Sequence, residues 1–254
     1  MPQPPLPAET RYWTRTGDRQ RVVNALFDRS AEHYDRACGI MSFGSGQGYR
    51  REALDRAGLR PGMHVLDVGT GTGLLAREIV HLLGSSGRVV GLDPSWNMMA
   101  AGRRELNLRF VQGLGERLPF PATRFDFVTM GYALRHVPDL DQTFEEYRRV
   151  LKPGGRLLLL EITRPASMLG MALARIYFGT IIPLVTRIST GSANAAELMR
   201  FYWETIAQCV PPETVLASLG RAGFATPDRA VVHGIFSEYT ATRGVSFGIN
   251  SGGA

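Results

Sequence analysis

The sequence predicts an α/β fold in which helices cover both faces of a mostly parallel sheet. Three observations carry this prediction. Short apolar runs alternate with amphipathic helical patterns between about residues 63 and 162. The strand-like runs, such as RLLLLEI at 156–162, are almost continuously apolar, as is typical of parallel strands buried on both faces. The chain has 254 residues, of which 44% are hydrophobic and 20% charged, enough for one α/β domain with a sizeable core.

The central alternation gives the elements in turn. The expected order is strand 63–68, helix 72–83, strand 88–93, helix 95–105, strand 108–112, strand 125–132, helix 139–151, a KPGG turn at 152–155 and strand 156–162.

Other helices precede and follow this alternation. Before it we expect a helix over 21–37, a glycine-rich linker at 41–49 and a helix that ends near Gly58. After it come an apolar segment at 166–188, a helix at 195–208, a helix at 212–224 and strands near 226–233 and 235–242. The predicted organisation is a flexible N-terminus (1–20), a single domain (21–243) with a cap insertion at about 166–208, and a disordered tail (244–254).

Charge, cysteine and histidine usage exclude several classes of protein. The net charge is +6 and comes almost entirely from arginine, since Lys152 is the single lysine. The arginines form no long basic run and do not alternate with aromatic residues, so a nucleic-acid partner is not expected. Cys38 and Cys209 are far apart, and no two histidines are spaced i, i+4, so neither a disulfide framework nor a metal site is expected. The first residues lack the layout of a signal peptide, which favours a cytoplasmic protein.

One segment, ASMLGMALARIYFGTIIPLVT at 166–186, is long and apolar. Arg175 lies in its middle, where a charge costs about 2.5–3.5 kcal/mol at a bilayer centre. Pro183 is expected to break its second half. We therefore expect a cap helix over an apolar pocket and no membrane span, while peripheral membrane contact and a homodimer stay open.

The stretch HVLDVGTGTGLLAREIV at 64–80 indicates a ligand site at a strand–turn–helix corner. Glycines at 69, 71 and 73 allow a tight turn and a close approach of a ligand to the backbone. In a doubly wound sheet, ligands bind at the carboxyl ends of the strands, where this turn lies. Asp93 ends the next strand and is placed to accept hydrogen bonds from a ribose diol.

Two ligand classes suit such a corner. A dinucleotide favours GxGxxG, but here the third glycine comes one residue early and Leu74 takes the last position. Asp67 would repel a pyrophosphate and suits a cationic ligand instead. A cationic ligand is therefore favoured over a dinucleotide, and a nicotinamide oxidoreductase is the less favoured prediction.

Several motifs along the chain resemble those of class I S-adenosylmethionine (SAM) methyltransferases, and more narrowly the ubiquinone/menaquinone biosynthesis C-methyltransferase family. The matching stretches are FDRSAEHYDRACGIMSFG (27–44), VLDVGTGTGLLA (65–76), ERLPFP (116–121), FDFVTMGYALRHVPDLD (125–141), RVLKPGGRLLLLEITRP (149–165) and LGRAGF (219–224). The resemblance implies a Rossmann-like fold with a mostly parallel seven-stranded sheet, N-terminal helices and an inserted helical cap, and SAM as the cofactor.

The resemblance also implies roles for individual residues. Gly69, Gly71 and Thr72 would surround the methionine part of SAM, and Asp67 belongs to the same motif. Asp93 would bind the ribose hydroxyls.

The remaining cofactor contacts are likewise implied. Met98 would pack against adenine, with Pro94 nearby, and Leu114 and Gly115 would flank it on the other side. Gly131 would lie near the sulfonium, and Tyr34 would belong to a helix that closes over the cofactor.

This chain departs from the family pattern at two informative positions. The residue before Gly115 is usually Asp or Asn, which can bind the adenine amino group, whereas Leu114 cannot. Family members often have LRN where this chain has LRH at 134–136.

Methyl transfer requires an acceptor atom behind the methyl group in a site shielded from water. A phenolic or enolic acceptor reacts better when it is deprotonated. The candidate catalytic residues after the fourth strand are Tyr132, Arg135 and His136, with Arg135 favoured as a group that stabilises an oxyanion.

The apolar cap favours a small hydrophobic acceptor. C-methylation of a quinone-type ring is the preferred prediction, and O- or C-methylation of another aromatic or polyketide-like metabolite is the alternative. A SAM-binding protein that does not methylate is a further possibility.

Overall fold

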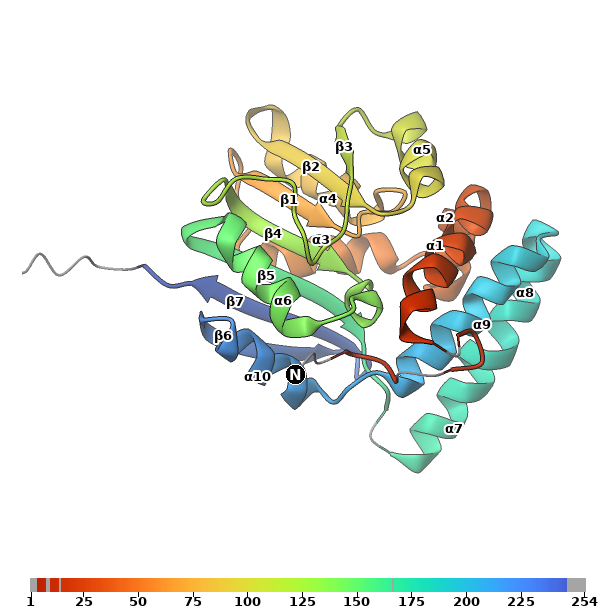
Figure 1. The fold of residues 1–254 in the computed structure, drawn as a ribbon. Coiled ribbons are helices and arrows are strands. Elements are labelled where there is room, and N and C mark those ends of the chain that lie inside the picture. Colours follow the sequence, from red (N-terminus) through yellow and green to blue (C-terminus); the bar gives the residue numbers. More distant parts are fainter. Residues whose placement is uncertain (1–3, 8–9, 14, 166, 246–254) are drawn as a thin grey trace, which may run out of the picture.

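The computed structural model describes residues 4–7, 10–13, 15–165 and 167–245. Its centre is a seven-stranded sheet in the order β3-β2-β1-β4-β5-β7-β6 (Figure 1). β1 is parallel to β2 and β4, and the parallel pairing continues to β3 and β5. Only β7 is antiparallel to its two neighbours, which confirms the expected mostly parallel seven-stranded sheet. The strands are β1 (His64–Val68), β2 (Arg88–Asp93), β3 (Arg109–Gln112), β4 (Phe125–Gly131), β5 (Leu151–Ile162), β6 (Phe224–Val232) and β7 (Phe236–Arg243).

Helices cover both faces of the sheet, and further helices form a cap beyond the carboxyl ends of the parallel strands (Figure 1). They are α1 (Arg19–Ser30), α2 (Tyr34–Met41), α3 (Gly46–Arg56), α4 (Leu74–Leu83), α5 (Trp96–Glu105), α6 (Leu140–Val150), α7 (Met168–Ile176), α8 (Ile182–Thr190), α9 (Ala193–Gln208) and α10 (Pro212–Arg221).

Side chains along each strand point alternately to the two faces of the sheet, so the protein has one apolar core on each face. Leu66 and Val68 of β1 pack with α6 and α10 on one face, whereas Val65 packs with α3 and α4 on the other. In β4, Val128 packs in the same core as Leu66, and Phe127 packs in the core on the opposite face. Successive side chains of a strand point to opposite faces, and here both faces are apolar because both are covered.

Four local predictions need correction. The expected linker at 41–49 is mostly helical, since α2 ends at Met41 and α3 begins at Gly46. The helix expected from residue 72 begins at Leu74, because Gly73 has φ 89° and cannot be helical. The expected KPGG turn is an irregularity within β5: Leu151 and Arg156 pair with β4, and the residues between them do not.

The fourth correction concerns Pro183, which does not break the apolar segment. α7 continues through a π turn at Tyr177–Ile181 directly into α8. A proline cannot donate to the carbonyl four residues earlier, and that carbonyl belongs to Gly179 inside the π turn. The wider turn accommodates the proline, so Met168–Thr190 is one continuous helix.

The described part of the N-terminal segment is packed against the protein, and the flexibility of 1–20 stays a prediction. Leu6 and Trp13 are buried, and Trp13 meets the ring of Phe201 at 6.3 Å. The backbone N–H of Val210 also donates to the carbonyl of Pro5 at 3.0 Å. Residues 1–3, 8–9 and most of the predicted tail lie outside the described residues.

Candidate active site

A deep cavity lies at the carboxyl ends of β1, β2 and β4, where the sequence placed the ligand. Its empty volume, which includes space open to solvent, is about 980 Å³. α1, α2 and α9 contribute Phe27, Tyr34 and Tyr202 to its lining. The cavity also includes every residue predicted to bind the cofactor: Tyr34, Asp67, Gly69, Gly71, Thr72, Asp93, Pro94, Met98, Leu114, Gly115 and Gly131.

The glycine turn after β1 exposes bare backbone to this cavity. Gly69 and Gly71 have φ values of 67° and 56°, which side chains rarely adopt. A Cβ on Gly69 would lie 2.7 Å from the Cβ of Ala133, and one on Gly71 would lie 3.1 Å from Met98. The turn is fixed to the sheet, since the N–H of Thr70 donates to the carbonyl of Leu92 at 3.0 Å.

Asp67 offers the cavity a carboxylate oxygen that has no protein partner. One oxygen accepts a hydrogen bond from the hydroxyl of Thr129 at 2.7 Å, and Oδ2 is buried without a partner. Burial raises the pKa of Asp67 to about 6. A buried, half-satisfied carboxylate of this kind suits a cationic group such as an ammonium.

Asp93 shapes the turn as well as facing the cavity. Its carboxylate accepts from the N–H groups of Gly71 and Ser95, each at 2.8 Å. Burial raises its pKa to about 6, although these two N–H groups favour the ionised form. A carboxylate has about four acceptor sites, so Asp93 can also accept from a diol.

The part of the cavity where the resemblance places adenine has an apolar wall. Met98 is buried beside the turn, while Leu114 is about 37% exposed at the other wall. Glu116 also lines the cavity and was missed, although the ERLPFP motif contained it. Burial raises the pKa of Glu116.

Two acidic side chains attach the N-terminal helices to the rim. Asp35 of α2 accepts from the hydroxyl of Thr72, and Asp28 of α1 accepts from the hydroxyl of Ser95, each at 2.5 Å. Both contacts join α1 and α2 to the elements that line the cavity. They hold these helices beside the cavity, whose lining includes Tyr34 of α2.

Tyr132 follows Gly131 at the end of β4 and lines the cavity. Its φ is 60°, a strained value for a residue with a large side chain, and such strain is common at functional sites. Its N–H donates to the carbonyl of Leu160 at 2.7 Å, which holds this conformation. Burial raises the pKa of the Tyr132 phenol, so the group is a hydrogen-bond donor at neutral pH and not a base.

His136 lines the same end of the cavity, and both of its ring nitrogens are buried without partners. Its ring stacks on Phe201 at 5.3 Å and meets the edge of Phe27 at 5.5 Å. Burial lowers its pKa well below 6.5, and the nearby charges of Arg135 and Arg19 lower it further. The imidazole is therefore neutral at neutral pH.

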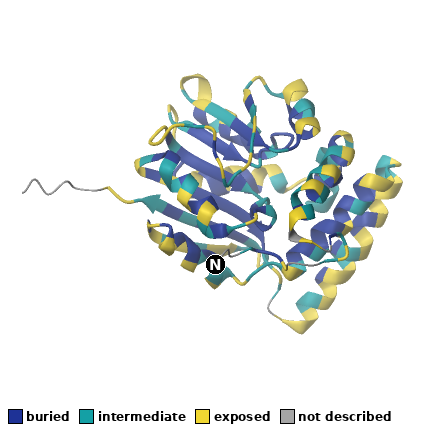
Figure 2. Cartoon of the chain, viewed as in Figure 1, coloured by how far each residue is buried: buried dark blue, intermediate teal, exposed yellow. Residues whose placement is uncertain are grey.

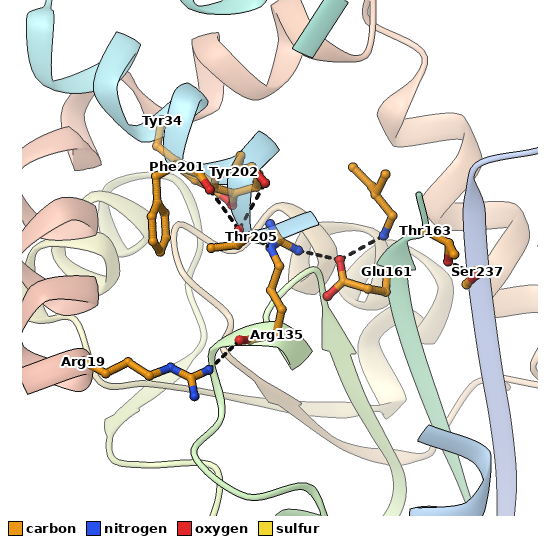
Figure 3. A network of polar contacts seen from close by, with 10 residues as sticks. Arg19, Tyr34, Arg135, Glu161, Thr163, Phe201, Tyr202, Thr205 and Ser237 are labelled. Carbon is orange, nitrogen blue, oxygen red and sulfur yellow. Dashed lines mark hydrogen bonds and ion pairs between the residues drawn. The ribbon is translucent and has the colours of Figure 1, made fainter. Parts of the chain in front are cut away.

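Arg135 does not reach the cavity, which corrects the expectation that its guanidinium emerges at the cofactor face. Its side chain is fully buried and forms an ion pair with Glu161 (Figure 3). Its Nε donates to the hydroxyl of Thr205 at 3.0 Å, and the guanidinium lies 4.6 Å from the ring centre of Tyr202. Because it packs behind Tyr202, Arg135 can act only through the residues that it supports.

The apolar cap contributes less to the cavity than expected. Within the described residues, the segment 166–188 supplies no lining residue, and α9 supplies Tyr202. Phe178 instead stacks on Trp203 with ring centres 6.2 Å apart, inside the cap itself. The sequence reasoning also missed Phe27 and Asn24 as lining residues, although helical spacing had placed Phe27 on the apolar face of its helix.

Comparisons with known proteins agree with this geometry. The model of the ubiE/COQ5 methyltransferase family matches residues 14–243. The chain belongs to this family. A protein from Pseudomonas paraeruginosa named ubiquinone/menaquinone biosynthesis C-methyltransferase UbiE is 37% identical over 222 residues, covering 85% of this chain and 84% of its own. A relative with the same name from Hahella chejuensis is 35% identical over 213 residues, covering 81% and 84%.

A solved structure confirms the fold. The SAM-dependent methyltransferase from Thermotoga maritima described as a possible histamine N-methyltransferase aligns with a TM-score of 0.61 and 20% identity, covering 86% of this chain and 98% of its own. This likeness supports the Rossmann-like fold alone.

The protein is therefore a SAM-dependent methyltransferase, and the cavity fits that cofactor. The orphaned oxygen of Asp67 suits the ammonium of SAM, and the glycine turn presents only backbone to the same cavity. Among the residues that the structure describes, no group of three or more His, Cys, Asp or Glu could hold a metal ion.

Proposed function

We propose that this methyltransferase methylates a ring carbon of a quinone-type acceptor in its hydroquinone form. The acceptor end of the cavity carries this proposal. Phe27 lies at its centre, with ring centres 6.1 Å from both Tyr34 and Tyr202 and 5.5 Å from His136. An aromatic wall with one neutral imidazole suits a flat, apolar ring that carries a hydroxyl. The printed names of the UbiE relatives describe C-methylation in quinone biosynthesis, which supports the same acceptor class.

The cofactor-binding residues hold the methyl donor in the proposed site. Asp67 and the glycine turn would bind its amino acid part, Asp93 its ribose, and Met98 and Leu114 its adenine. When bound, SAM supplies an electrophilic methyl group on a positively charged sulfur. The apolar wall excludes water, so that the loss of this charge during transfer is favoured.

The residues at the acceptor end remove the proton of the acceptor hydroxyl and bind the acceptor oxygens. His136, neutral because of its lowered pKa, accepts the proton of the acceptor hydroxyl. Tyr132 donates a hydrogen bond to an acceptor oxygen. The activated ring carbon forms a bond to the methyl carbon while the methyl–sulfur bond breaks and its electron pair stays on sulfur. The same ring carbon then loses its hydrogen as a proton to solvent, which restores the aromatic ring. His136 returns its proton to the acceptor oxygen, so that one proton is released for each methyl group transferred.

Arg135 and Glu161 position this wall and do not touch the acceptor. The guanidinium supports the ring of Tyr202, whose hydroxyl lies 2.7 Å from that of Tyr34. This pair joins α9 to α2 above the acceptor.

A methyl-transfer assay with purified enzyme tests the proposal. We expect faster turnover with a hydroquinone that has a free ring carbon and an apolar side chain than with a catechol or a polar phenol. His136→Asn should lower kcat by about 100-fold, as is typical when an acid–base group is lost, and leave SAM binding unchanged. His81→Asn on the exposed face of α4 is the matched control. Turnover confined to the catechol or the polar phenol would reject the quinone-type acceptor.

A further inference from the structure

An exposed apolar stripe runs along the outer side of the cap helix, defined as the continuous helix Met168–Thr190. This helix is long and apolar enough to cross a membrane, with a mean hydropathy of 1.7. Figure 2 shows much of its outer side as exposed. The large apolar side chains that form the stripe are Leu169, Leu173, Ile176, Ile181, Leu184 and Ile188, each at least 44% exposed.

The opposite side of the cap helix is packed into the protein. Phe178, Ile182 and Thr186 are buried, and α8 lies against α9 and α2. One buried side and one exposed apolar side are incompatible with a helix surrounded by lipid. They are compatible with a helix that lies flat in a membrane interface.

A second element extends the stripe. Phe43, in the turn between α2 and α3, is 83% exposed and has a φ of 49°. Its ring stacks on Tyr177 of the π turn, with ring centres 5.8 Å apart. An aromatic ring held out to solvent beside an apolar helix is typical of residues that enter a membrane interface.

The charged residues of the cap helix and of its flanking segments are all positive. The sequence has no Asp or Glu between Glu161 and Glu197, but it has Arg164, Arg175 and Arg187. All three arginines are exposed, and within the described residues none forms an ion pair. Such a surface is complementary to anionic lipid headgroups.

We propose that the cap helix and Phe43 dock this enzyme on an anionic membrane surface, with the apolar stripe in the interface and the arginines at the headgroups. A second copy of the chain fits the surface less well. A two-fold interface places the same patch on both sides, so arginines would face arginines without an acidic partner. The proposal does not depend on the identity of the methyl acceptor, because docking requires neither SAM nor acceptor.

Vesicle flotation with the full chain tests this proposal. Wild-type protein should float with phosphatidylcholine vesicles that contain about 30% phosphatidylglycerol, and bind pure phosphatidylcholine more weakly. Leu173→Ser/Ile188→Ser should weaken binding to both vesicles at least about tenfold, because it removes two exposed apolar side chains that the membrane interface would bury. Arg175→Gln/Arg187→Gln should weaken binding to the anionic vesicles by about fivefold per arginine and leave the weaker binding to neutral vesicles unchanged.

Matched variants elsewhere on the surface serve as controls. Val231→Ser on β6 removes an exposed apolar side chain, and Arg104→Gln on α5 removes an exposed charge. Both should bind vesicles like wild type, and thermal melting checks that every variant is folded.

Four results would overturn the proposal. The first is no flotation of the wild type, and the second is unchanged flotation of Leu173→Ser/Ile188→Ser. The third is resistance to alkaline carbonate extraction, which would indicate a spanning helix. The fourth is a dimer that this double variant dissociates while the wild type binds no vesicles, which would assign the surface to a second copy.

Discussion

Replacing Arg135 should destabilise the protein without abolishing methyl transfer in the folded fraction. Arg135→Ala removes the partner of the buried carboxylate of Glu161, and both side chains are at most 4% exposed. Breaking a buried pair from one side costs about 3–5 kcal/mol. For a domain of this size that corresponds to a fall in Tm of roughly 10 °C.

The double variant Arg135→Met/Glu161→Met separates the lost charge partner from the lost packing. Replacing a buried ion pair by apolar side chains of similar volume is often neutral, so most of the stability should return, to within about 1–2 kcal/mol of wild type. Glu161→Gln leaves the arginine unpaired and should again be destabilised. Thermal melting of the four proteins gives these differences directly.

Kinetics then decide whether the guanidinium takes part in the chemistry. Well below its Tm, Arg135→Ala should keep kcat within about tenfold of wild type, because no guanidinium atom reaches the cavity. The KM for the acceptor should rise, since Tyr202 loses the cation that lies 4.6 Å from its ring centre. A 100-fold fall in the kcat of folded Arg135→Ala, or of the more stable Arg135→Met/Glu161→Met, would contradict this expectation and assign Arg135 a part in the chemistry.

Three further predictions concern the cofactor end. Asp93→Asn should weaken SAM binding by about ten- to a hundredfold in calorimetry, because it replaces a charge-assisted acceptor; unchanged affinity would remove Asp93 from the ribose site. Leu114→Asp should tighten SAM binding by about 0.5–1.5 kcal/mol by adding an acceptor for the adenine amino group, and a loss would mean that this edge is already satisfied. SAM affinity should rise with pH and level off above about 6, because Asp67 and Asp93 have pKa values raised to about 6 and bind best when ionised. A pH-independent SAM affinity would contradict this. The same raised pKa values mean that the ligand-free fold loses stability as pH rises from about 4 to 6, and thermal melting without SAM across this range checks it.

The sheet and the cofactor end could be predicted from the sequence because their signals are local. Apolar strands, a glycine turn and an acid at the end of the next strand are each visible within a few residues. Asp67 and Asp93 then meet at the same sheet edge because parallel strands end there together.

The acceptor end could not be predicted in the same way because it depends on side-chain direction. Arg135 and His136 are neighbours in the 3₁₀ turn Leu134–His136, yet one points into the cap and the other into the cavity. What turns Arg135 away is Glu161, which is 26 positions along the chain and shows no local pattern with it. The sequence pattern does not distinguish Tyr202 from the other apolar and aromatic residues of the cap. Its position above the cavity depends on how α9 packs against α1 and α2.

The most direct measurement locates the transferred methyl group. The enzyme is incubated with SAM that carries a ¹³C-labelled methyl group and with a hydroquinone that has one free ring carbon, and the product is studied by NMR. We expect a labelled methyl bonded to that ring carbon, formed at least about 100-fold more slowly by His136→Asn than by His81→Asn. A labelled methyl on oxygen, or SAM binding without any labelled product, would contradict it.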